Sequence, residues 1–170
     1  MKKILIACLL LCLVYSGFSQ SLTDGEYMVK IGQTGQYIAI AAAAHVNGAR
    51  AVQWEKEYSS HFLFIITHLG NDVYSIMAKH SGKYLSTEGD AKAGAKLIQW
   101  DWLNQDNQKW YILPHPGGKG FVMNSFTEKF PVVIQYWNSL VTPRKGAYLY
   151  LQGDPNFRPM LLDFKKNEVE

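Results

Sequence analysis

The chain has 170 residues, of which 48% are hydrophobic and 14% aromatic, and its formal net charge is +3. This length suits one domain with a sizeable core. Lys2 and Lys3 supply two of the positive charges, and the rest of the chain has no Lys/Arg cluster that would suit a phosphate backbone. Nucleic acid is therefore not an expected partner.

The first nineteen residues have the layout of a secretory signal peptide. A basic start at Lys2 and Lys3 precedes an apolar run over residues 4–14, and Gly17 and Ser19 offer the small residues that a signal peptidase reads. The run is too short to span a membrane. We expect cleavage after Ser19, a mature chain 20–170 with a formal charge of +1, and a secreted or periplasmic location. A buried N-terminal helix is the alternative, but it leaves the two lysines unexplained.

Both cysteines, Cys8 and Cys12, lie inside this segment. The residues that end at Cys8 resemble a lipoprotein box, but only four apolar residues precede that cysteine, which is few for an export core. The mature chain is thus expected to contain no cysteine and no disulfide, so its stability must come from packing.

Residues 20–170 contain an internal repeat of about 47 residues. In each unit an apolar run opens on an aromatic residue, a polar turn leads to a second aromatic, a Gly-Ala pair follows, and a last apolar run closes the unit. The opening aromatics are Tyr27, Tyr74 and Phe121, and the second aromatics are Tyr37, Tyr84 and Phe130. The Gly-Ala pairs stand at 48–49, 94–95 and 146–147, and the closing runs start near Phe64, Trp110 and Leu161.

Runs of four to six apolar residues between turns indicate strands. Three units of four strands predict about twelve strands and an all-β fold. A propeller is disfavoured because propellers typically need at least four blades, whereas a closed three-fold assembly fits three units. Residues 38–46 have helix propensity, but the repeat register favours a strand that ends in a loop. About five extra residues precede Gly146 in the third unit, and Pro131 predicts an edge strand there.

The second unit carries a family resemblance. Ser81-Gly82-Lys83-Tyr84-Leu85, then Gly94-Ala95, Trp100-Asp101 and Asn107-Gln108-Lys109-Trp110, resemble in order and spacing the motifs of the ricin B-type β-trefoil lectins. The repeat pattern covers residues 20–170, but the full motif occurs only once. The resemblance implies a β-trefoil of three repeats, roughly 24–70, 71–117 and 118–164, and a carbohydrate-binding function without catalysis.

In that family an Asp after the first turn and an Asn on a later loop bind vicinal hydroxyls, and an aromatic stacks on the sugar ring. Carried over to the second unit, the resemblance implies a site with Trp100 as the platform, Asn107 and Gln108 on the loop, and Ser86 where the family has Asp. Ile98 stands where a Gln is usual. Without a charged acceptor the family's galactose geometry is not expected, and the predicted site is shallow and weak. Asp101 should point to the face opposite Trp100.

The other two units depart further from the family pattern. The first keeps Trp54 as a possible platform, but Ala39 replaces the Asp, and His61 and Phe62 replace the Asn-Gln pair. In the third unit the corresponding residues are Val132 or Val133, Leu151, Arg158 and Pro159, which predict no sugar site.

Several of these residues have an alternative structural interpretation. Phe64, Trp110 and Leu161 are expected in a shared core, and Gln108 is expected to tie its loop to the backbone. Trp54 and Trp100 are either exposed platforms or packed against a neighbouring loop. Tyr136 and Trp137 in the third unit either form a surface contact or anchor their loop.

Other chemistries lack support in the sequence. The five histidines do not have metal-ligand spacing, although three-fold symmetry leaves open that some meet in space, and no cofactor motif is present. Nothing places two carboxylates around a cleft as a glycosidase requires, so no enzymatic activity is expected. The alternative function is a protein-interaction or inhibitor-like trefoil that has lost its sugar site and presents loops such as 136–145.

Overall fold

The computed structural model describes residues 21–135, 144–154, 157 and 159–167. The predicted all-β fold is confirmed: these residues form twelve strands and short 3-10 turns, without an α-helix. The strands of the first repeat are β1 (Gly25–Ile31), β2 (Tyr37–Ile40), β3 (Ala51–Trp54) and β4 (Leu63–Gly70). Those of the second are β5 (Val73–Ala78), β6 (Lys83–Thr87), β7 (Leu97–Trp100) and β8 (Trp110–Pro114). Those of the third are β9 (Phe121–Ser125), β10 (Val132–Ile134), β11 (Leu149–Leu151) and β12 (Leu162–Lys166).

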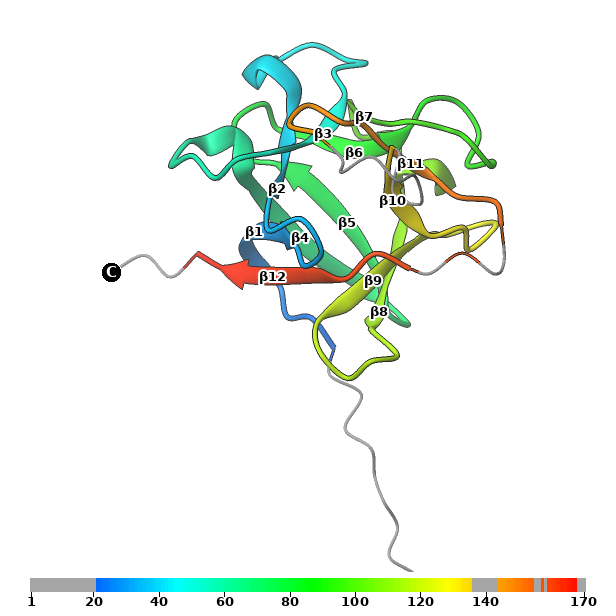
Figure 1. The fold of residues 1–170 in the computed structure, drawn as a ribbon. Coiled ribbons are helices and arrows are strands. Elements are labelled where there is room, and N and C mark those ends of the chain that lie inside the picture. Colours follow the sequence, from blue (N-terminus) through cyan, green and yellow to red (C-terminus); the bar gives the residue numbers. More distant parts are fainter. Residues whose placement is uncertain (1–20, 136–143, 155–156, 158, 168–170) are drawn as a thin grey trace, which may run out of the picture.

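The first and last strands of the three repeats form a closed six-stranded antiparallel barrel (Figure 1). The ring runs β1-β4-β5-β8-β9-β12 and returns to β1 through the pairing of Tyr27 with Lys166 and of Ile31 with Leu162. Closure satisfies the backbone groups that an open sheet would leave at its edges. The remaining strands form three hairpins, β2-β3, β6-β7 and β10-β11. This arrangement is the closed three-fold assembly that the repeat pattern predicts and the β-trefoil that the family resemblance implies.

The Gly-Ala pairs join each hairpin to the next. The N–H of Gly48 donates to the carbonyl of Gln99 at 2.9 Å, and the N–H of Gln99 donates back to the carbonyl of Ala49 at 2.8 Å. The same reciprocal pair links Gly94-Ala95 to Leu151 and Gly146-Ala147 to Gln53. The three glycines have φ of 84°, 81° and 85°, a left-handed conformation that side chains disfavour. The turn therefore explains the repeated glycine.

The core lies inside the barrel. Tyr27 faces Phe64, Tyr74 faces Trp110, and Phe121 faces Leu162 across neighbouring strands, and all six side chains are buried. The predicted core position Leu161 is therefore wrong by one residue. Leu161 is only partly buried and lies against Gly32 and Gly120, because strand alternation directs Leu162 into the barrel.

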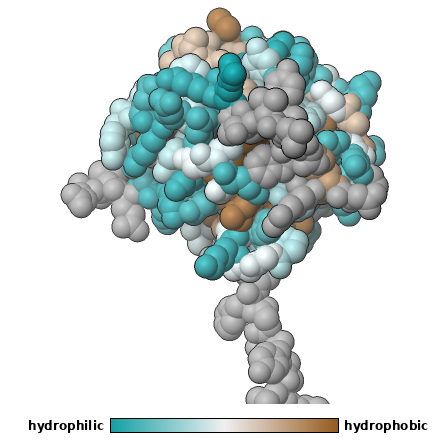
Figure 2. Space-filling model, viewed as in Figure 1, coloured by the Kyte–Doolittle hydropathy of each residue, from teal (hydrophilic) through white to brown (hydrophobic). Residues whose placement is uncertain are grey.

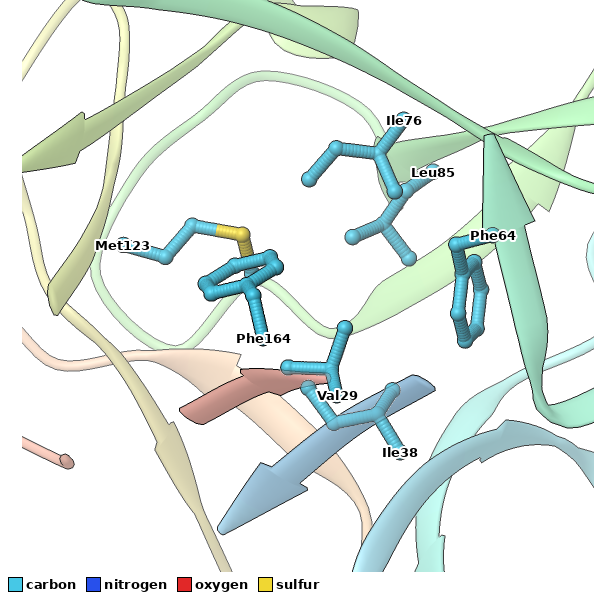
Figure 3. A pocket seen from close by; sticks show the side chains of 7 residues that line it. All are labelled: Val29, Ile38, Phe64, Ile76, Leu85, Met123 and Phe164. Atoms are coloured by element: carbon cyan, nitrogen blue, oxygen red, sulfur yellow. The ribbon is translucent and has the colours of Figure 1, made fainter. Parts of the chain in front are cut away.

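A small cavity of about 10 Å³ marks the barrel centre (Figure 3). Seven apolar side chains from strands of all three repeats converge on it: Val29, Ile38, Phe64, Ile76, Leu85, Met123 and Phe164. The lining offers no polar partner for a water molecule, so the cavity is too apolar to be hydrated. The core is thus a packed interior rather than a ligand site.

Two irregular segments behave as predicted. The apolar run after Tyr37 ends as a strand at Ile40 and continues into a 3-10 turn, Ala41–Ala43, rather than a helix. In the third repeat, β10 pairs only with β11 and forms a separate two-stranded sheet, whereas β2 and β6 also pair with barrel strands. Pro131, which has no N–H to donate, keeps a single bridge to Asn124.

The predicted signal peptide and Tyr136-Trp137 lie outside the described residues. Within the described part of the chain, no helix is long and apolar enough to cross a membrane. The face shown in Figure 2 is largely hydrophilic, and its hydrophobic residues form small separate patches.

Candidate functional site

The β6-β7 hairpin positions the candidate site of the second repeat. Tyr84 pairs with Trp100, Leu85 with Gln99, and Ser86 with Ile98. Because side chains alternate along a strand, Leu85 enters the core while Ser86, Ile98 and Trp100 lie on the other face. The hairpin thus places two predicted site residues side by side.

These side chains line a pocket of about 450 Å³, which we call the second-repeat pocket. The turn at Glu88 and Gly89, the loop from Leu103 to Gln108, and Gly48 from the first repeat complete it. Four of the five predicted site residues line this one pocket: Trp100, Asn107, Ser86 and Gln108. Trp54 lies in a different pocket.

Trp100 forms an open wall of the second-repeat pocket. Its side chain is 39% exposed. Among the described residues, its indole has no hydrogen-bond partner and no aromatic or cation contact. Gly48 of the first repeat lies beside it, and a Cβ added at this glycine would lie 3.9 Å from the ring. The other indole of this loop, Trp102, packs on Tyr84 with ring centroids 4.5 Å apart. Trp100 is therefore the indole free to stack on a ligand.

Asn107 is anchored to the turn that follows β6. Its Nδ2 donates to the carbonyl of Gly89 at 3.1 Å and approaches that of Thr87 at 3.5 Å. These two carbonyls fix the orientation of the amide, and the buried Oδ1 has no partner in the described structure. Asn107 therefore lines the pocket with an amide of fixed orientation, and its buried Oδ1 is an acceptor without a partner among the described residues, which is costly.

Ser86 lies on the floor of the pocket. It is buried, and its hydroxyl donates to the carbonyl of Thr87 at 3.2 Å. No acid takes its place, and Glu88 is the only charged side chain among the described residues that line the pocket. A ligand therefore meets one aromatic face, the aliphatic side chains of Ile98 and Leu103, neutral polar groups and one exposed carboxylate.

Gln108 holds the loop that carries Asn107. It is buried, its Oε1 accepts from the N–H of Leu103 at 2.7 Å, and its Nε2 donates to the carbonyl of Asp101 at 2.8 Å. The predicted structural role of Gln108 is confirmed. Both ends of its amide are occupied, so its contribution to a binding site is to fix the loop.

Asp101 lies outside the second-repeat pocket, as strand alternation predicts. Its carboxylate accepts from Lys83 and, at 2.8 Å, from Nδ2 of Asn47, and these hydrogen bonds lower its pKa. Because Asn47 belongs to the first repeat, this contact joins the two repeats at the edge of the pocket.

The first repeat has an equivalent pocket of about 330 Å³. Ala39 pairs with Val52 there as Ser86 pairs with Ile98, and His61 is on its wall. Its indole is engaged: Nε1 of Trp54 donates to Glu57 at 2.9 Å, and Nζ of Lys145 lies 4.4 Å from the ring centroid. Trp54 thus differs from Trp100 in having a cation over its ring.

The third repeat requires a correction of register. Leu151 hydrogen-bonds to Ala95 as Gln99 does to Ala49, so Leu151 takes the place of Gln99 and not that of Trp100. Gln152 consequently stands at the Trp100 position. Val133, which pairs with Tyr150, occupies the place of Ser86. Arg158 lies outside the described residues.

Three histidines meet between the first and second repeats, which sequence spacing did not reveal. The His80 ring lies 5.1 Å from that of His45 and 6.3 Å from that of His61, and its Nε2 bonds to the carbonyl of Ala44 at 2.9 Å. Burial lowers the pKa of His80; the bond to Ala44 opposes this, and His45 and His61 lower the pKa further. Within the described residues, no group of ligating side chains could hold a metal ion.

The fold is a β-trefoil, and comparison with known proteins places the chain in a family. The sequence matches the family described as ricin-type beta-trefoil lectin domain-like over residues 17–100 and again over 64–143. These matches cover most of the 170 residues, so the chain belongs to this family. No curated protein matches the chain.

Solved structures share the fold at low sequence identity. The designed three-fold symmetric protein ThreeFoil has 20% identity and a TM-score of 0.74, with 85% of this chain and 100% of ThreeFoil covered. The Rhizoctonia solani agglutinin has 13% identity and a TM-score of 0.72, with 86% of this chain and 98% of the agglutinin covered. An exo-β-1,3-galactanase from Clostridium thermocellum has 18% identity and a TM-score of 0.74, and 88% of this chain matches 31% of that enzyme. The shared part of the galactanase is therefore a minority of its chain.

Proposed function

We propose that this protein is an exported carbohydrate-binding module and that the second-repeat pocket is its sugar site. The observation that carries the proposal is the half-exposed, unpartnered indole of Trp100 beside Asn107 and Ser86 in one pocket. Membership of the ricin-type lectin family supports the same function. The proposed role is binding, with no chemical step.

The proposed mechanism is stacking assisted by neutral hydrogen bonds. The apolar face of a pyranose packs on Trp100, and its hydroxyls hydrogen-bond to the pocket wall that Asn107 and Ser86 form. One aromatic platform with two such bonds supports roughly millimolar affinity, about 4 kcal/mol. Useful retention on a surface then needs a multivalent polysaccharide. Glu88 is the only charged residue among the described ones that line the pocket, and its negative charge favours a neutral sugar over an anionic one.

Replacing the platform tests this proposal. We expect Trp100→Ala to abolish retention on immobilised neutral polysaccharides and the fluorescence response to simple sugars, with little change in the urea midpoint. The matched control is Trp54→Ala, which removes the equivalent indole of the first repeat and should retain binding. Retention that survives Trp100→Ala would exclude the second-repeat pocket as the site.

A second candidate function is a protein-interaction or inhibitor-like module. Exposed apolar side chains on the loops of the first two repeats favour it: Val46 is 66% exposed, and Leu103, on the rim of the second-repeat pocket, is 55% exposed. The modified pockets of the first and third repeats also fit this alternative. A glycan array with no hit at high protein concentration, together with capture of a specific protein, would favour the alternative.

Export is part of the proposal. The basic start and the apolar run of residues 4–14 support a signal peptide cleaved after Ser19. Mass spectrometry of the protein recovered outside the cytoplasm should show an N-terminus at Gln20. A full-length cytoplasmic chain would contradict this.

A further inference from the structure

A pocket of about 260 Å³ lies in the third repeat, where the family pattern predicts no sugar site. Tyr150 pairs with Val133 there as Ile98 pairs with Ser86, and Gly94 stands where Gly48 borders the second-repeat pocket. The pocket therefore overlaps the trefoil position equivalent to the proposed sugar site, but it also takes in Lys96 and Tyr148, whose counterparts Arg50 and Lys96 do not line the second-repeat pocket. We call it the third-repeat pocket.

The lining of the third-repeat pocket has the opposite charge from that of the second-repeat pocket. Lys96 is its only charged side chain among the described residues, and no salt bridge of Lys96 occurs within the described structure. A backbone bridge joins Lys96 to Tyr150, and both residues line the pocket. An unpaired cation on a half-buried wall favours an anionic ligand.

The neighbouring groups are also suited to an anion. Burial raises the pKa of Tyr150, so its hydroxyl stays protonated and can donate at neutral pH. The amide of Gln135 supplies further donors. The guanidinium of Arg50 lies 4.5 Å from the ring centroid of Tyr148, so a second positive charge stacks on one of the lining rings.

The nearest acid along the hairpin belongs to the other pocket. The N–H of Glu88 donates to the carbonyl of Lys96 at 2.8 Å, but the Glu88 side chain lines the second-repeat pocket. The two adjacent pockets thus present a carboxylate and an ammonium group respectively. This difference separates their expected ligands.

We propose that the third-repeat pocket binds an anionic saccharide, with the carboxylate or sulfate group on Lys96 and Tyr150 and the sugar ring beside Tyr148. The charge, and not the family's Asp and Asn, selects the ligand at this position. Because the lining and the ligand class differ from those of the second-repeat pocket, each of the two sites can be confirmed or refuted independently of the other.

Calorimetric titration of the mature protein at low ionic strength tests the proposal. The probes are trigalacturonate, its fully methyl-esterified form and a sulfated galactose disaccharide. We expect binding of at least one anionic probe, no binding of the ester at this pocket, and weakening at high salt. Binding by only one of the two anions would identify carboxylate or sulfate as the recognised group.

The decisive variant is Lys96→Met, which keeps the length of the side chain and removes its charge. We expect at least about tenfold weaker binding of the anionic probe, because a hydrogen bond to a charged group is lost. Lys96→Arg should retain binding, and Lys92→Met on the same loop is the matched control that should bind normally. Trp100→Ala should leave this affinity unchanged, which separates the result from the proposed function.

Three results would overturn the proposal. The first is that neither anionic probe binds, the second is equal binding of the acid and its methyl ester, and the third is a Lys96→Met affinity equal to that of the unmodified protein. Circular dichroism of each variant establishes that the fold is intact, and Lys96→Gln replaces Lys96→Met if the latter unfolds.

Discussion

The pockets of the first and second repeats share one backbone register and differ in what surrounds the indole. In the second repeat, Asn47 reaches across from the first repeat to Asp101 and leaves the ring of Trp100 open. In the first repeat, the equivalent contact is the ion pair of Lys145 with Glu55, and the same ammonium lies over Trp54. Whether the indole of a pocket is accessible therefore depends on residues of the neighbouring repeat as well as on the motif of its own repeat.

The largest expected effect on stability comes from a substitution in the barrel core, which supports both pockets. Trp110 is fully buried, and its Nε1 donates to the carbonyl of Leu85 at 3.1 Å. We expect Trp110→Ala to lower the free energy of unfolding by about 3–5 kcal/mol because it leaves a cavity in the barrel. Urea denaturation measures this change. A loss below about 1 kcal/mol, as expected for Trp100→Ala, would contradict the assignment of Trp110 to the core.

The next effect concerns the loop that makes the second-repeat pocket. Gln108→Ala removes the hydrogen bonds of the Gln108 amide to the backbone of Leu103 and of Asp101. We expect the free energy of unfolding to fall by about 1–3 kcal/mol because these backbone groups lose their partners. Sugar binding should fall with it. The exposed Gln105 on the same loop gives the control Gln105→Ala, measured in the same denaturation experiment. Equal stability of the two variants would refute the structural role of Gln108.

A substitution with a smaller effect on stability should make the first-repeat pocket resemble the second-repeat pocket. Lys145→Ala removes the cation above Trp54 and its ion pair with Glu55, and we expect a change in stability of no more than about 1 kcal/mol because such exposed pairs contribute little. Trp54 fluorescence should then become sensitive to neutral sugars in a Trp100→Ala background. If Trp54 remains unresponsive, Lys145 is not what closes the first-repeat pocket.

The smallest expected effect is a dependence of stability on pH. Because the pKa of His80 is lowered in the folded protein, the unfolded chain takes up a proton more readily than the folded chain. The stabilisation from His80 is therefore complete above the unfolded pKa, about 6.5, and is lost as the pH falls toward the folded value. Denaturation midpoints measured between pH 8 and pH 5 should decline. The decline should be smaller in His80→Gln, and an equal decline would assign it to other groups.

The sequence predicted the fold because the fold depends on features that recur. The spacing of Tyr27, Tyr74 and Phe121 follows from one buried position in each repeat, and the Gly-Ala pairs follow from one left-handed turn. The same logic predicted that Gln108 is structural. The predicted register is nevertheless one residue early at two positions of the third repeat. Counted from the Gly-Ala pairs, Leu151 corresponds to Gln53 and Gln99, and Leu162 rather than Leu161 corresponds to Phe64 and Trp110.

The candidate sites were harder to predict because they depend on single contacts between repeats. No periodicity shows that Lys145 lies over Trp54, or that His45, His61 and His80 meet. The donors of Asn107 are used by the turn at Gly89, which is visible only once the loop is placed. Trp100 was predictable as a candidate platform, whereas its openness depends on the small residue Gly48 in another repeat.

The central claim is that the second-repeat pocket, and not its counterpart in the first repeat, binds a neutral sugar. The most direct measurement is a titration of the mature protein with neutral mono- and oligosaccharides, followed through the indole N–H signals in ¹H–¹⁵N spectra. Trp100→Phe and Trp54→Phe assign the two signals. We predict that the Trp100 signal moves with saturable, roughly millimolar affinity while the Trp54 signal stays in place. Movement of the Trp54 signal alone, or of neither signal, would contradict the account.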